Sequence, residues 1–196
     1  MMKWRLDLTP GFPAFLAAVW YFDSCGIFWP FLAAMTVHEL VHAAVLLLLG
    51  GGIESVRLSF AQVELRTGLL SDRTELWSTA AGPGINLLCG WLFRRWMPAF
   101  AAVSLLLALF NLLPVWPLDG GRLLRTLLRM HWGAAGVDAS QTLGLLFGLG
   151  LLAGAVFAAR RWDAGVWPAV TAGALLVRLL RSRYAEKAVA FPAAEQ

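Results

Sequence analysis

Long apolar runs recur along this chain, and they constrain its fold more than any other feature. They cover residues 11–22, 29–50, 75–93, 98–116, 139–159 and 165–181. A helix needs about 20 mostly apolar residues to cross a bilayer. Of the 196 residues, 59% are apolar and 14% are charged, whereas soluble domains contain about 25% charged residues. The sequence therefore predicts an all-α polytopic membrane protein with about six transmembrane helices, forming one domain over residues 1–196.

The basic residues between these runs predict an orientation. Lysine and arginine exceed the acidic residues by 16 to 12, but no basic cluster alternates with stacking aromatic residues, so no nucleic-acid partner is expected. With six spans, twelve basic residues fall on one side of the bilayer and four on the other. Because an excess of Lys and Arg marks the cytoplasmic side, we expect a multi-pass protein of the cell membrane with both termini cytoplasmic. A five-span alternative, without the first run, moves the N-terminus outside.

The segment between the second and third runs has a different pattern. Residues 53–66 alternate roughly between apolar and polar side chains, which is typical of a strand. We expect a small β-hairpin or re-entrant element here, and an ordinary loop is an equal alternative. The stretch 119–138, which carries three arginines, is expected to be a cytoplasmic loop. Residues 139–181 then hold the C-terminal spans, and 182–196 a cytoplasmic tail.

The second run contains the motif His38-Glu39-Leu40-Val41-His42. Residues four apart lie on one face of a helix, so the two imidazoles can bind one zinc ion while Glu39 activates water. Burying these groups in an apolar helix costs several kcal/mol unless they are paired, metal-bound or near water. A polar contact between helices or a proton relay is the less specific alternative.

Zinc in a catalytic site takes a third protein ligand and keeps one position open. The candidate is Asp119, which follows Pro114 and Pro117 and precedes a Gly-Gly pair. Proline frees the backbone from a helix at this point, so the carboxylate can turn toward the histidines. Taken alone, an aspartate before two glycines is more often a turn or a helix cap.

The HELVH motif, followed about seventy residues later by NLLPVWPLDGGR, resembles the site-2 proteases, zinc metalloproteases that cut proteins within the membrane. The resemblance covers a catalytic core of about residues 30–130 and is greatest for the minimal sporulation-type subgroup (stage IV sporulation protein FB). It implies one zinc ion per chain, held by His38, His42 and Asp119, with Glu39 as general base. It also implies that Asn111 and Pro117 hold an extended substrate. The subgroup further suggests a sigma-factor precursor as substrate and an inhibitory membrane partner.

Asn86 follows a stretch of small residues in the third run. A buried asparagine usually bonds a neighbouring helix, and substrate binding is the functional alternative. For the whole chain, the leading hypothesis is an intramembrane zinc metalloprotease acting on a membrane protein substrate. A metal or proton transporter using the same His, Glu and Asp cluster is the alternative, although no internal repeat supports it. A catalytically silent scaffold is a third hypothesis. The sequence does not identify the substrate or the oligomeric state.

Overall fold

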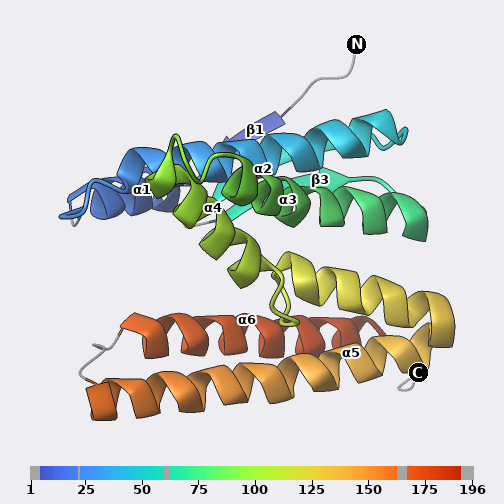
Figure 1. Cartoon of the computed structure of the whole chain (residues 1–196). Coiled ribbons are helices and arrows are strands. Elements are labelled where there is room, and N and C mark those ends of the chain that lie inside the picture. The colour runs from blue at the N-terminus through green and yellow to red at the C-terminus, as the bar shows by residue number, and fades with distance from the viewer. Residues whose placement is uncertain (1–4, 22, 60–61, 163–166, 191–196) are drawn as a thin grey trace. The chain divides into compact units, whose positions relative to one another are not determined.

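The computed structural model describes residues 5–21, 23–59, 62–162 and 167–190 (Figure 1). The chain divides into two compact units, Met1–Asn111 and Leu112–Gln196. The first unit combines a small sheet with four helices, and the second consists of two long helices that follow an irregular segment.

Three helices of the first unit pack together: α2 (Phe28–Leu48), α3 (Asp72–Leu92) and α4 (Pro98–Asn111). Helix α1 (Gly11–Tyr21) precedes them. The core between the three packed helices centres on Ala34, Cys89 and Phe100, one residue from each helix. The ring of Phe93 meets that of Phe100 edge-on at 5.5 Å between centroids, a favoured aromatic arrangement. This core fixes α2 against α3, which matters because α2 carries the two histidines.

Local sequence signals explain where the two central helices begin. The first N–H groups of a helix lack intrahelical partners. At α2 they are satisfied by Asp23, whose carboxylate accepts hydrogen bonds from the backbone N–H groups of Ile27 (2.9 Å) and Phe28 (2.8 Å). At α3 the Ser71 hydroxyl accepts from the N–H of Thr74 at 3.2 Å, a typical N-cap interaction.

A three-stranded sheet accompanies these helices, in the order β1 (Arg5–Leu8), β2 (Ile53–Ser59) and β3 (Gln62–Thr67). Strands β2 and β3 are antiparallel, with Val56 opposite Leu65. This confirms the hairpin interpretation of residues 53–66 over the loop alternative. Strand β1 pairs with β2 in parallel and was not expected, because a four-residue strand is too short to give a periodic pattern.

The second unit is built on α5 (Asp119–Trp162) and α6 (Trp167–Ala190), which pack against each other (Figure 1). Helix α5 bends at Gly133, where φ is 56° and ψ is −132°. A β-carbon on Gly144 or Gly148 would lie 3.2–3.8 Å from leucine side chains of α6. These two glycines therefore let the helices approach closely, as small residues do in membrane helix pairs.

Helices occur in all six predicted runs, with three differences. Helix α6 continues to Ala190, whereas the last run was expected to end at residue 181 and to be followed by a tail, of which residues 191–196 lie outside the described part of the chain. The stretch 119–138, expected to be a loop, is helical except at Gly133, because its arginines recur at helical spacing and polar residues do not by themselves end a helix. The fourth run, expected to reach residue 116, ends as a helix at Asn111. Pro114 explains the earlier end, since proline disfavours the α conformation in the residue before it.

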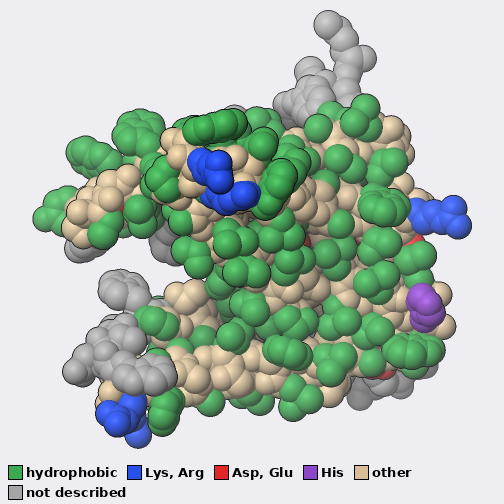
Figure 2. Space-filling view, viewed as in Figure 1, with side chains coloured by type: hydrophobic (Ala, Val, Ile, Leu, Met, Phe, Trp, Pro, Cys, Tyr) green, Lys and Arg blue, Asp and Glu red, His purple; other side chains and the backbone are tan. Residues whose placement is uncertain are grey.

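Length and hydropathy mark two helices of the described residues as able to cross a membrane, Phe28–Leu48 and Asp119–Arg161. Helices α1 and α4 are apolar but shorter, so the number of crossings stays a prediction. Apolar side chains cover much of the face seen in Figure 2. Several exposed tryptophans lie near helix ends, and membrane proteins concentrate this residue at the membrane–water interface: Trp20, Trp29, Trp91 and Trp96. Trp132 is also exposed and lies next to the bend of α5. This surface is typical of a membrane protein.

Candidate metal centre

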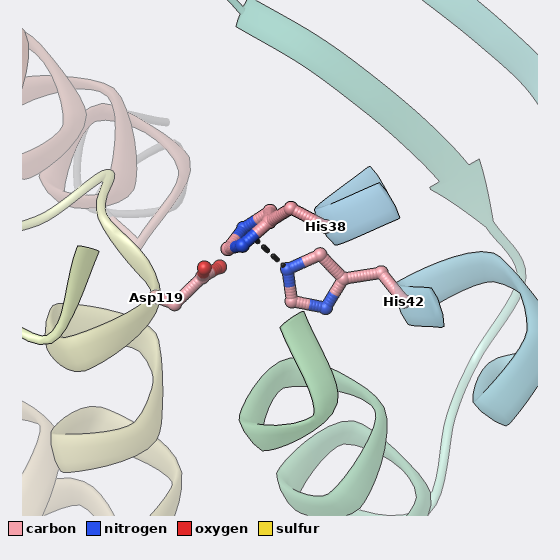
Figure 3. A group of neighbouring side chains, drawn as sticks. All are labelled: His38, His42 and Asp119. Atoms are coloured by element: carbon pink, nitrogen blue, oxygen red, sulfur yellow. Dashed lines mark hydrogen bonds between the residues drawn. The ribbon is translucent and has the colours of Figure 1, made fainter. Parts of the chain in front are cut away.

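Two buried histidines stand one helical turn apart on α2. The exposed fraction is 4% for His38 and 9% for His42. Their Nε2 atoms lie 3.0 Å apart, and the rings are nearly perpendicular, with centroids separated by 4.5 Å. Figure 3 shows both imidazoles pointing from the helix toward the same space. The predicted i, i+4 arrangement is therefore present, with one nitrogen of each ring directed to a common point.

The opposite nitrogen of each ring is held by α3. Nδ1 of His42 lies 2.6 Å from the backbone carbonyl oxygen of Ser78, and Nδ1 of His38 lies 3.1 Å from the amide nitrogen of Asn86. The earlier residue on α2 thus meets the later residue on α3, so the two helices run antiparallel. Metal-binding histidines usually have such a partner on the second ring nitrogen, which fixes the ring orientation.

Gly82 stands between these two contacts on the same face of α3. A β-carbon at this position would lie 2.5 Å from Cε1 and 2.7 Å from Cδ2 of His42. Ser78, Gly82 and Asn86 are spaced four residues apart, so they form one stripe along α3. Any side chain larger than hydrogen at the centre of this stripe would displace the imidazole.

Glu39 is half-buried on α2, next to the first histidine. In the same unit Asn111 is the last residue of α4, and its amide nitrogen donates to the carbonyl oxygen of Leu107 at 3.0 Å. For Asn86 the sequence favoured a bond to a neighbouring helix, with substrate binding as the functional alternative. Its side chain is fully buried, and its amide nitrogen contacts His38 of α2.

In the second unit Asp119 is the first residue of α5 and is 8% exposed. The two glycines after it are packed against the backbone of the segment before it. A β-carbon on Gly121 would lie 2.5 Å from the backbone nitrogen of Trp116, and one on Gly120 would overlap the carbonyl of Leu112. Pro117 is half-buried within this segment. The Gly-Gly pair therefore fixes how the chain enters α5, and with it the backbone of Asp119.

This chain is similar to known proteins of one class, the peptidases of family M50. A family model described as peptidase family M50 matches residues 88–155. The fold resembles the site-2 protease from Methanocaldococcus jannaschii, with a TM-score of 0.68, 20% sequence identity, and coverage of 92% of this chain and 91% of that one. At this identity the likeness concerns the fold.

The chain is also similar to two curated proteins, from two strains of Mycobacterium tuberculosis, and both are named as the zinc metalloprotease Rip3. Each is 34% identical over 201 residues, covering 85% of this chain. The chain spans about half the length of these curated relatives, 49%. The chain is thus similar, over residues 88–155, to peptidase family M50, and over most of its length to proteins named as zinc metalloproteases. Neither relative is described as a sporulation protein, so the sporulation-type subgroup stays a prediction.

Sequence reasoning missed two contributors to the centre. The carbonyl of Ser78 leaves no side-chain signal, because any residue could provide it. Gly82 belongs to the stretch of small residues before Asn86, and nothing in that stretch alone indicates its contact to His42. The four-residue spacing of Ser78, Gly82 and Asn86 is the signal that could have identified the face of α3 that meets the histidines.

Proposed function

We propose that this chain is an intramembrane zinc metalloprotease that cleaves a membrane-associated or transmembrane protein. The observation that carries the proposal is the pair of buried HExxH imidazoles on α2, whose Nε2 atoms lie 3.0 Å apart and whose Nδ1 atoms both contact α3. The apolar helix around them, the match to the M50 family model and the zinc metalloprotease relatives agree with this function.

The zinc ligands in this proposal are His38, His42 and Asp119. All three side chains are buried, and each offers one atom that can bind a metal ion. Two imidazoles and one carboxylate fit the donor set of catalytic zinc sites, which leaves a fourth position for water or substrate. Bound zinc would polarise the scissile carbonyl and make water a stronger nucleophile at neutral pH.

Glu39 is the proposed general base. It follows His38 directly on α2, so its carboxylate starts from the same turn of helix as the first ligand. It would take a proton from the attacking water and return it to the leaving amine. A positioned acid or base of this kind contributes typically 10²–10⁴-fold to the rate.

The substrate would bind as an extended chain, because a helix hides its carbonyl groups in internal hydrogen bonds. Strand β3 lies at the edge of the sheet and pairs with β2 in the described part of the chain. Its other edge can accept a further strand through main-chain hydrogen bonds. In this proposal Asn111 and Pro117 hold the extended substrate, as the resemblance to the site-2 proteases implies.

A finer proposal concerns the biological substrate. The sporulation-type resemblance suggests a sigma-factor precursor and an inhibitory membrane partner, within regulated intramembrane proteolysis. The support for this part is the motif resemblance in the sequence, since the comparisons reach the family and not the subgroup.

The proposal is tested by comparing the wild type with Glu39→Gln in otherwise identical cells. Quantitative mapping of new protein termini in isolated membranes should reveal cleavage products that need Glu39. We expect these products to fall at least about 100-fold in the variant, while zinc content stays at the wild-type level. Unchanged products in Glu39→Gln would exclude the protease function.

The transporter alternative gives a different result. Purified protein in proteoliposomes would then move Zn²⁺ or protons across the bilayer, and this flux would depend on His38 and His42. The protease proposal predicts no such flux. The relatives favour a protease, and the sequence lacks the internal repeat typical of many transporters.

A further inference from the structure

The hydrogen bond between His42 and Ser78 fixes which nitrogen of His42 carries a proton. A backbone carbonyl oxygen can only accept, so Nδ1 of His42 must donate across the 2.6 Å contact. In a neutral imidazole the other nitrogen is then an acceptor. Nε2 of His42 therefore has its lone pair directed toward Nε2 of His38, 3.0 Å away.

His38 is arranged in the opposite way. Because Nε2 of His42 is the acceptor, Nε2 of His38 donates to it, and Nδ1 of His38 is left as an acceptor. The amide nitrogen of Asn86 donates to this Nδ1 at 3.1 Å. The carbonyl oxygen of the same amide is completely buried and has no hydrogen-bond partner among the described residues. A buried polar atom without a partner is costly and calls for an explanation.

Metal binding through both Nε2 atoms requires the other tautomer of His38. A metal takes the lone pair of a neutral imidazole nitrogen, so the proton of His38 must then reside on Nδ1. That proton needs an acceptor where the Asn86 nitrogen now lies. Rotation of the amide by half a turn exchanges its nitrogen and oxygen, and brings the unpartnered oxygen to Nδ1.

We propose that Asn86 is a positioning residue that selects the metal-binding tautomer of His38 through rotation of its side-chain amide. This inference rests on the proposed function for the identity of the two histidines as zinc ligands. It gives Asn86 a role in metal affinity, which differs from substrate binding, the functional alternative considered from the sequence. Ser78 holds His42 permanently in the binding tautomer, whereas Asn86 can support either tautomer of His38.

The test is the zinc affinity of the full chain purified in detergent, measured by competition with a chelator. Asn86→Leu removes both the donor and the acceptor at similar volume, and zinc should bind about 10–100-fold more weakly, as when other partners of ligand histidines are lost. Asn86→Asp provides only acceptors, which suit a protonated Nδ1. It should bind zinc at least as tightly as the wild type.

Thr79→Val is the matched control, because Thr79 is a buried residue of the same helix and its hydroxyl has no hydrogen-bond partner in the described part of the chain. Its zinc affinity should equal that of the wild type. If Asn86 only fills space, Asn86→Leu will bind zinc normally, whereas the buried charge of Asn86→Asp will weaken binding. This order of affinities would overturn the proposal.

A second measurement needs no variant. In wild-type protein labelled with ¹⁵N-histidine, adding Zn²⁺ should move the proton of His38 from Nε2 to Nδ1, which the ¹⁵N chemical shifts report. Zinc bound through Nδ1 of His38 would overturn the inference.

The inference and the proposed function can fail separately. Normal zinc affinity in Asn86→Leu together with Glu39-dependent cleavage would reject the inference and keep the protease. If the variants bind zinc in the predicted order but no Glu39-dependent cleavage occurs, the inference about Asn86 holds and the protease function is rejected.

Discussion

Gly82 of α3 faces the imidazole of His42 on α2 so closely that no β-carbon fits between them. This close contact and the hydrogen bond from His42 to the Ser78 carbonyl together restrict the ring to one orientation. The packing of the two helices and the geometry of the candidate metal centre therefore depend on the same residues. A substitution on α3 should therefore affect metal binding even though it replaces no ligand.

Gly82→Ala tests this dependence. The added methyl group would lie 2.5 Å from Cε1 of His42, so the ring or the helix must move. Overpacking of this kind costs typically about 1–3 kcal/mol, and we expect a lower midpoint of thermal unfolding together with weaker zinc binding.

Gly84→Ala is the control for this prediction. Gly84 lies on the same helix, is exposed, and has open space where its β-carbon would stand. Since alanine favours a helix over glycine by about 1 kcal/mol, this variant should be at least as stable as the wild type. Equal zinc affinity in the two alanine variants would contradict the account of Gly82.

Gly121→Ala should disturb the start of α5 in the second unit. Its β-carbon would lie 2.5 Å from the backbone nitrogen of Trp116, and backbone atoms cannot rotate away as a side chain can. We expect a loss of stability at or above the upper end of the overpacking range, about 3 kcal/mol, and loss of zinc through displacement of Asp119. Gly150→Ala, in an open position of the same helix, should leave both properties unchanged when they are measured by thermal unfolding and elemental analysis.

The pH dependence of the start of α2 follows from Asp23. Hydrogen bonds from the N–H groups of Phe28 and Ile27 lower the pKa of its carboxyl group below the ordinary value, because they favour the charged form. A lowered pKa in the folded protein means that this carboxylate stabilises the fold fully above the ordinary aspartate pKa, about 3.9. The contribution is lost as the pH falls through the lowered pKa.

Amide hydrogen exchange at Ile27 and Phe28 measures this effect. We expect protection in the wild type to fall below about pH 4. In Asp23→Asn protection should be weaker at neutral pH and should lack that step. Identical protection profiles for the two proteins would show that the carboxylate does not hold the helix start.

The sequence predicted the histidine pair because its signal is local. Spacing of four residues on an apolar helix determines the relative placement of His38 and His42 without any knowledge of the fold. The partners on α3 depend on which helices pack together, and the sequence contains that information only as a stripe of small residues. The carbonyl of Ser78 carries no sequence signal at all.

The same distinction explains the errors in the fold. Residues 119–138 were expected to form a loop because they are polar, yet Arg122, Arg125 and Arg129 recur three and four residues apart, which fits a helix. For this segment, the helical spacing of the arginines is a better guide to the structure than the polarity of its side chains. Strand β1 depends on pairing with β2, about fifty residues later, and no property of its four residues predicts that pairing. The number of membrane crossings stays a prediction.

The central proposal is that this chain holds one zinc ion through two histidines of α2 and an aspartate of α5. Elemental analysis of the detergent-purified full chain measures this directly, in the wild type and in the variants His42→Ala and Asp119→Ala. The account predicts about one zinc per chain in the wild type, the usual occupancy of a three-ligand catalytic site, and its loss in both variants. A wild-type protein without zinc, or an Asp119→Ala variant that retains the full amount, would contradict it.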